Sequence, residues 1–138
     1  MSPLHWITYF ISYAIDLPES KISLDQNIVV PDLAGWKQER FPVEEPHNWI
    51  SIAPDWLCEI LSPSNASNDT VKKKRVYHRH GVSHYWIIDP MNETLTVYRW
   101  TEEAYLEILT AARGECVRAE PFDAVEMHVG VFFGDDEE

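Results

Sequence analysis

The clearest hydrophobic pattern in the chain lies between residues 53 and 90. Two apolar runs, 56–61 and 82–89, are each bounded by turn-forming residues, which is the pattern of buried strands. Between them, residues 69–80 are mostly polar with apolar positions at helical spacing, and Gly81 follows as a helix stop. The stretch therefore predicts strand, helix and strand, with the helix as the crossover connection.

One charged residue, Glu59, interrupts the first apolar run. A charged group inside a buried strand is unfavourable unless it is paired or binds a metal. At about 100° per residue, one face of the predicted helix carries Asp69, Lys73, Val76, Tyr77 and His80. Val76 and Tyr77 are its apolar anchors, so Lys73 should point with them towards the sheet. The pattern thus predicts a lysine directed at the strand that carries the glutamate.

Other residues of this region have roles that the pattern leaves open. Asp69 suits the N-cap of the helix, or it pairs with Lys73 one turn later. Tyr77 either hydrogen-bonds in the site or anchors the helix, and anchoring is the favoured interpretation. The nearby histidines do not have the spacing of a metal-ligand set, and surface or helix-cap roles are favoured for them: His78, His80 and His84.

A further acidic residue, Asp32, follows a short β-branched segment. Residues 28–30 read Ile-Val-Val and predict a strand. Pro31 cannot donate a hydrogen bond to a ladder and therefore suits a strand end or a bulge. Asp32 is accordingly expected at the point where a sheet opens.

These motifs together resemble the Uma2 family, also known as DUF820, a restriction-endonuclease-like group of the PD-(D/E)xK superfamily. They are Val-Val-Pro-Asp-Leu-Ala at 29–34, Ala-Pro-Asp-Trp-Leu-Cys-Glu-Ile-Leu-Ser-Pro-Ser at 53–64, the helical Asp69, Lys73 and Tyr77, and Gly-Val-Ser-His-Tyr-Trp-Ile-Ile-Asp-Pro at 81–90. The resemblance runs from about residue 18 to near the end of the chain. The agreement in order and spacing is more specific than any single motif.

The resemblance implies an α/β (α+β) fold, a mixed β-sheet core with a crossover helix, and metal-dependent endonuclease activity on nucleic acid, with DNA as a candidate partner. It implies Asp32 and Glu59 as metal-binding acids, with the backbone carbonyl of Ile60 completing the shell around Mg²⁺ or Mn²⁺. The chain also departs from the standard nuclease motif, because Leu61 stands where that motif has lysine. In the Uma2 family this lysine is thought to have moved to the following helix, and Lys73 occupies that helical position. A homodimer is the implied assembly.

The remaining chain predicts additions to this core. Residues 94–100 alternate polar and apolar positions and 104–111 continue as a strand, which together indicate an antiparallel meander. Residues 121–133 fit either an edge strand or a short helix. Residues 4–15 fit either a helix or a strand, and 38–51 form a long loop.

Length and composition set limits on the protein class. The 138 residues, 45% of them hydrophobic, fit one domain over 1–138, short at its N-terminal end compared with the family. No apolar run approaches the length of about 18 residues that a membrane span needs, so no membrane partner is expected. Cys58 and Cys116 have neither disulfide nor zinc spacing, which favours a reducing, cytoplasmic location.

The net charge of −12 counts against non-specific affinity for nucleic acid. Five of the 11 basic residues nevertheless lie on the predicted helix: Lys72, Lys73, Lys74, Arg75 and Arg79. Apart from Lys73, they form either a solvated face or a surface that follows phosphates. Two other functions stay open. One is a catalytically inactive binding or assembly module in which Glu59 and Lys73 form a structural ion pair. The other is a phosphoesterase acting on a small nucleotide substrate.

Overall fold

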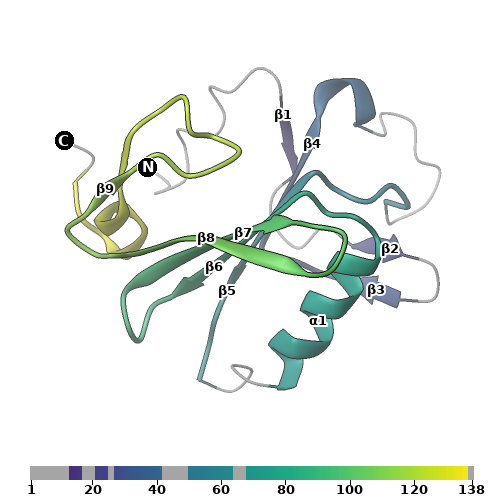
Figure 1. Ribbon diagram of the computed structural model, residues 1–138, viewed down its shortest axis with the longest axis horizontal. Coiled ribbons are helices and arrows are strands. Elements are labelled where there is room, and N and C mark those ends of the chain that lie inside the picture. The colour runs from purple at the N-terminus through teal and green to yellow at the C-terminus, as the bar shows by residue number, and fades with distance from the viewer. Residues whose placement is uncertain (1–12, 17–20, 25–26, 42–49, 64–67, 137–138) are drawn as a thin grey trace.

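The computed structural model describes residues 13–16, 21–24, 27–41, 50–63 and 68–136 (Figure 1). In chain order, the elements are β1 (Tyr13–Asp16), β2 (Ile22–Leu24), β3 (Asn27–Val29), β4 (Leu33–Lys37), the 3-10 helix η2 (Gln38–Arg40), β5 (Trp56–Ile60), α1 (Asn68–Arg79), β6 (His84–Asp89), β7 (Thr94–Trp100), β8 (Tyr105–Ala112), β9 (Cys116–Val117), β10 (Met127–His128) and the 3-10 helix η3 (Val129–Phe133).

The central sheet has the strand order β1-β4-β5-β6-β7-β8. β5 and β6 pair in parallel, and the other neighbouring strands of this sheet pair antiparallel. α1 connects β5 to β6, because parallel neighbours need a crossover connection. The predicted mixed sheet with a crossover helix and an added meander is therefore confirmed, and β7–β8 is that meander.

The C-terminus of α1 shows why the helix ends where it does. Gly81 has a φ of 70°, in the left-handed region where a side chain is disfavoured. Its N–H donates to His78 O at 3.0 Å, and Val82 N–H donates to Tyr77 O at 3.1 Å. These two bonds form a Schellman motif, which satisfies carbonyls that a helix end leaves unpaired. The predicted stop at Gly81 is confirmed, and the helix start was predicted one residue late, since α1 begins at Asn68.

One face of the sheet packs against α1 and the β2–β3 hairpin. Leu57 of β5 and Tyr85 of β6 are adjacent in the parallel register, and neither is exposed to solvent. They share a buried cluster with Tyr77 of α1 and Ile22 of β2. Because side chains alternate along a strand, this same face also receives Glu59, two residues after Leu57.

The opposite face is covered by the C-terminal segment. Trp56, Trp86 and Phe122 are fully buried there and meet edge to face, with ring centroids 5.2–5.7 Å apart. Figure 1 shows this segment and α1 on different sides of the sheet. Such aromatic pairs are favourable beyond the area that they bury, so the tryptophan-rich strands and the C-terminal segment form the second half of the core.

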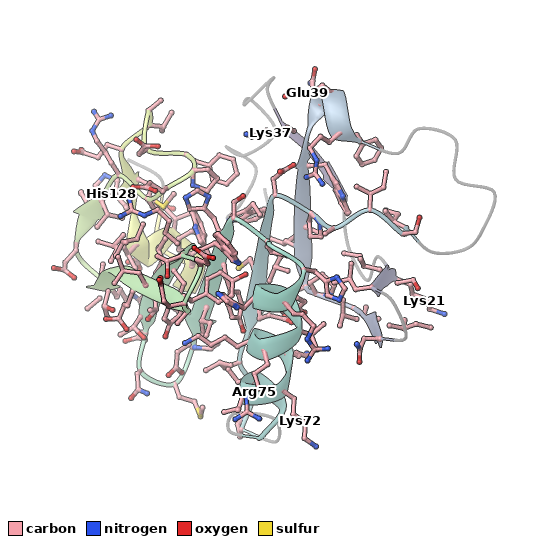
Figure 2. The ribbon with its side chains drawn as sticks, turned by 45° about the vertical axis from the view of Figure 1, so that its right-hand side comes forward. Lys21, Lys37, Glu39, Lys72, Arg75 and His128 are labelled. Atoms are coloured by element: carbon pink, nitrogen blue, oxygen red, sulfur yellow. The ribbon has the colours of Figure 1, made fainter. Side chains whose placement is uncertain are left out.

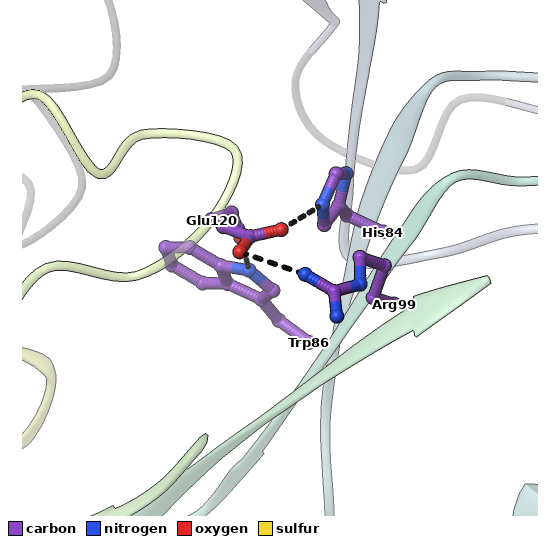
Figure 3. A network of polar contacts seen from close by, with 4 residues as sticks. All are labelled: His84, Trp86, Arg99 and Glu120. Atoms are coloured by element: carbon purple, nitrogen blue, oxygen red, sulfur yellow. Dashed lines mark hydrogen bonds and ion pairs between the residues drawn. The ribbon is translucent and has the colours of Figure 1, made fainter. Parts of the chain in front are cut away.

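A polar network at the margin of that core ties the C-terminal segment to the sheet (Figure 3). Trp86 Nε1–H donates to the backbone oxygen of Glu120 at 2.7 Å. The Glu120 carboxylate contacts His84 Nε2 at 3.0 Å and Arg99 at 3.2 Å. The favoured surface or helix-cap role of His84 was therefore wrong, since His84 begins β6 and links it to residue 120.

The strand predicted at 28–30 does not belong to the central sheet. β3 pairs with β2 in a separate two-stranded sheet, and the strand that joins the central sheet is β4. β4 reads Leu-Ala-Gly-Trp-Lys, whose glycine and short alanine obscure the strand pattern. Asp32 consequently precedes its strand directly, and is separated from the β-branched segment by Pro31.

Other elements follow the sequence pattern closely. β7 has the predicted bounds, and β8 is shifted by one residue. Residues 121–133 contain both predicted alternatives, a short strand (β10) and a short helix (η3). Residues 13–16 are strand, whereas 4–12 lie outside the described residues. No helix of the described chain combines the length and apolar character needed to cross a membrane.

Candidate active site

Glu59 is one of two buried acidic residues in the described chain, with 6% of its surface exposed. Its carboxylate receives two groups from α1. The hydroxyl of Tyr77 donates a hydrogen bond to Oε2 at 2.7 Å, and Lys73 Nζ lies 3.4 Å from the same oxygen. Tyr77 is fully buried as well, so it both anchors the helix and binds the acid, where sequence analysis favoured anchoring alone.

Asp32 lies beside Glu59 across two neighbouring strands. Leu33 pairs with Cys58 in the antiparallel register of β4 and β5. Asp32 directly precedes Leu33 in the chain, and Glu59 directly follows Cys58. The Oδ2 atom of Asp32 accepts a hydrogen bond from the backbone N–H of Ile60 at 2.7 Å. The negative charge of Asp32 is close enough to raise the pKa of Glu59. Two carboxylates therefore lie near each other at the C-terminal end of β5.

The electrostatics of Glu59 show a carboxylate balanced between opposing effects. Burial is the largest effect and raises the pKa of Glu59, and the negative charge of Asp32 raises it further. The Tyr77 hydrogen bond and the Lys73 charge act in the other direction. A cation between the two carboxylates would favour the ionised form of Glu59. The ionised pair of acids would in turn attract the cation.

The other buried acid, Asp55, has a structural role. Its Oδ2 accepts the backbone N–H of Lys37 at 2.8 Å, and its Oδ1 lies 2.6 Å from Arg40. These contacts hold η2 against the start of β5. Asp55 is therefore paired with an arginine and hydrogen-bonded by a backbone amide, both of which are structural contacts. Glu59 is contacted instead by the hydroxyl of Tyr77 and the ammonium of Lys73.

Tyr85 is a residue of this region that sequence analysis did not select. Its hydroxyl is buried and has no hydrogen-bond partner among the described residues. Burial, and next the charge of Glu59, raise the pKa of the Tyr85 phenol above its usual value, so it stays protonated. The alternating pattern of its strand indicated that Tyr85 lies on the same face of the sheet as Leu57. The sequence did not indicate that its hydroxyl has no hydrogen-bond partner among the described residues.

The donor set fits a hard divalent cation. The described residues contain no group of three or more histidine, cysteine, aspartate or glutamate side chains arranged to hold a metal ion. Mg²⁺, however, is commonly held by one or two carboxylates, with water and substrate phosphate completing its shell. Asp32 and Glu59 meet that requirement. The side chain of Asp69 lies outside the described part, so its contact with Lys73 stays a prediction.

Comparison with known proteins identifies the family. A family model named Uma2, with the description "Putative restriction endonuclease", matches residues 8–130. The chain belongs to the Uma2 family. No curated protein matches it. Among solved structures, the Uma2 chain is similar to the crystal structure of a "putative nuclease belonging to DUF820" from Anabaena variabilis, with a TM-score of 0.73 and 25% identity. The match covers 95% of this chain and 74% of that chain.

Membership in Uma2 and the solved relative agree on a nuclease-like fold. In this Uma2 chain the strand–helix–strand unit brings Glu59, Lys73 and Tyr77 together, and Asp32, the residue before β4, lies near Glu59. These residues are spread over 46 positions of sequence, from 32 to 77. The fold thus concentrates two acids, a cation and a phenol near the C-terminal end of β5.

Proposed function

We propose that this Uma2 protein is a metal-dependent endonuclease that hydrolyses phosphodiester bonds of nucleic acid. The observation that carries the proposal is the buried Glu59 carboxylate, which contacts Tyr77 and Lys73 and lies beside Asp32. A carboxylate with a raised pKa next to a specific charged partner is typical of functional sites. The family and the fold of its relative support the same reaction class.

In the proposed site, Asp32, Glu59 and the backbone carbonyl of Ile60 would hold Mg²⁺ or Mn²⁺. The ion would lower the pKa of a bound water and neutralise charge on the phosphate. The hydrogen bond from Ile60 N–H fixes the orientation of Asp32. The bond from Tyr77 does the same for Glu59 and favours its ionised form.

Lys73 has the proposed role of stabilising charge on the phosphate. Its side chain is 27% exposed, so the ammonium reaches both Glu59 and the solvent side of the site. Positive groups aimed at the place where negative charge develops are among the largest contributions to catalysis. The ammonium also favours the ionised form of Glu59, so one residue serves both the acid and the substrate.

A second function is favoured by the same ion pair. If Lys73 and Glu59 only neutralise each other, the protein is a catalytically inactive binding or assembly module. The two functions differ in one property, since only the endonuclease requires a divalent cation.

The first test is a cleavage assay on circular single-stranded and duplex DNA and on RNA, with Mg²⁺, with Mn²⁺ and with EDTA. We expect cleavage only with a divalent ion. Lys73→Met should reduce the rate by about a hundredfold, the effect of removing one charge-stabilising group. Lys72→Met is the matched control, because Lys72 is an exposed neighbour on the same helix. Equal loss in both variants, or cleavage in EDTA, would contradict the proposal.

We also propose a homodimer in a reducing, cytoplasmic environment. Cys58 and Cys116 are both free thiols in the described structure, which suits a reducing compartment. Two copies would allow both strands of a duplex to be cut. Sedimentation equilibrium should give twice the chain mass of 16.1 kDa, and a mass of one chain would rule the dimer out.

A further inference from the structure

A groove of about 680 Å³ runs along α1 on a side of the helix that does not face Glu59. The groove is lined from α1 by Lys74, Arg75, His78 and Arg79, and from the segment before and into β8 by Glu103 and Tyr105. Lys73 contacts Glu59, and Lys74 follows about 100° further around the helix. The candidate active site and this groove are therefore neighbouring surfaces of one helix.

The cations of the groove have no carboxylate partners in the described structure. The chain contains 23 acidic residues, yet the ion pairs among described residues involve none of Lys74, Arg75 and Arg79. Lys74 instead lies over the ring of Tyr98, with Nζ 3.9 Å from the ring centroid. In a protein of net charge −12, three basic side chains of this groove thus form no ion pair among the described residues, although Glu103 lines the opposite wall.

Helix stabilisation explains only part of this arrangement. Basic side chains in the last turn interact favourably with the helix dipole, and this accounts for His78 and Arg79. Lys74 and Arg75 lie in the middle of α1, where that effect has faded. His78 is also committed to the structure, since Nε2 contacts Thr101 O at 2.7 Å and its ring stacks on Trp100.

We propose that this groove binds the phosphate backbone of the nucleic-acid strand on which the Glu59 site acts. This inference rests on the proposed function, because it assigns a substrate surface to that site. Lys74 to Arg79 spans about 7.5 Å of helix axis, which matches the rise of about two nucleotides along one strand. The positive surface continues past Lys73, so a strand held in the groove is led towards Glu59.

Figure 2 shows where a variant and its control would act. Arg75 extends from α1 at one end of the molecule, and Lys37 lies at the other end, as the last residue of β4. Both side chains are exposed. Removing either one changes the net charge equally, so a difference between them reports on location and not on total charge.

The experiment measures binding of a fluorescent single-stranded oligonucleotide by anisotropy in EDTA, over a range of salt concentrations. Arg75→Ala should weaken binding at low salt by roughly tenfold, the effect of removing a charge-assisted hydrogen bond, and Arg75→Ala/Arg79→Ala should weaken it by roughly tenfold per arginine. The slope of log affinity against log salt should fall by about 0.7 for each phosphate that is no longer neutralised, or about 1.4 in the double variant. Arg75→Lys/Arg79→Lys should recover most of both, and Lys37→Ala should leave both unchanged.

Glu103→Gln tests the opposite wall. Glu103 contributes a negative charge to the groove, so its removal should strengthen binding of the oligonucleotide. Polyglutamate and a mononucleotide serve as competitors. Polyglutamate competing as well as the oligonucleotide would mean an acidic protein partner. A mononucleotide doing so would mean a small-molecule site. Either outcome overturns the proposal.

The proposal is also overturned if the parent does not bind the oligonucleotide, or if Arg75→Ala binds it as tightly as Lys37→Ala does. Circular dichroism should show that the variants fold, since both arginines are exposed. The measurement is separate from the proposed function because it contains no divalent ion. Oligonucleotide binding without any metal-dependent cleavage would support the groove as a binding surface and contradict the proposed endonuclease function. Metal-dependent cleavage, with binding unaltered in the arginine variants, would support the endonuclease function and contradict the proposed role of the groove.

Discussion

Glu59→Gln is expected to reduce metal-dependent cleavage by about a thousandfold, a loss of about 4 kcal/mol of transition-state stabilisation. The amide keeps the shape of the side chain and can still accept the Tyr77 hydrogen bond. It removes the negative charge that would hold the cation. Calorimetric titration of Mg²⁺ or Mn²⁺ should show binding to the parent and none to the variant.

The same variant should be at least as stable as the parent at neutral pH, which separates an effect on chemistry from an effect on folding. Burial raises the pKa of Glu59, so the folded chain binds this proton more tightly than the unfolded chain does. The destabilising effect of Glu59 is therefore absent at low pH and grows as pH rises from the unfolded-state pKa through the raised folded-state pKa. A neutral glutamine has no such dependence.

Thermal unfolding at several pH values measures that difference. The melting temperature of Glu59→Gln should exceed that of the parent by a few degrees above neutral pH, and the gap should close in acid. A variant that is inactive and also much less stable would assign Glu59 to the architecture. A variant that is equally stable, and a parent without metal binding, would favour the inactive binding module.

Trp86→Ala has the largest expected effect on folding. The indole is fully buried, and its ring centroid lies 5.3 Å from that of Trp56 and 5.7 Å from that of Phe122. Truncating a buried tryptophan costs about 3–5 kcal/mol, and a typical domain has only about 5–15 kcal/mol of stability. Urea unfolding should therefore show a midpoint shifted strongly towards zero denaturant.

Trp86→Phe separates the packing of this residue from its hydrogen bond. The phenyl ring keeps much of the aromatic packing but cannot donate to Glu120 O, which Trp86 does at 2.7 Å. We expect less than half of the alanine effect. An alanine variant as stable as the parent would show that the C-terminal segment is not part of the core. Equal destabilisation in both variants would assign the effect to the Glu120 hydrogen bond.

The local order of the core was predictable because its signals lie close together in sequence. Two apolar runs with a helical segment and Gly81 between them define strand, crossover helix and strand, and the Schellman bonds at Gly81 follow from its lack of a side chain. The helical spacing also set Lys73 and Tyr77 on one face, and both contact Glu59. Nearest-neighbour geometry is enough for such inferences.

The position of β4 was not predictable in the same way. Its alanine and glycine are weak strand formers, and the strand exists because it pairs with β5 on one side and β1 on the other. The preceding β-branched segment, with the stronger local signal, forms a hairpin outside the central sheet. Tertiary pairing overrode local preference here, and that pairing brings Asp32 close to Glu59.

The groove and the C-terminal tether depend on still longer contacts. Arg75 and Arg79 were visible as part of a basic helix, but only the approach of the segment before β8 makes their surface concave. The role predicted for His84 was wrong because nothing near it in sequence signals Glu120, 36 residues later. The sequence by itself determined the crossover unit and the lysine that faces its glutamate, because periodicity acts over a few residues. The family resemblance named Asp32 as the second acid, and the tertiary structure places it near Glu59. The tertiary structure alone decided which cations of the described chain lack carboxylate partners and what covers the tryptophans. Each of these depends on segments that meet only when the chain folds.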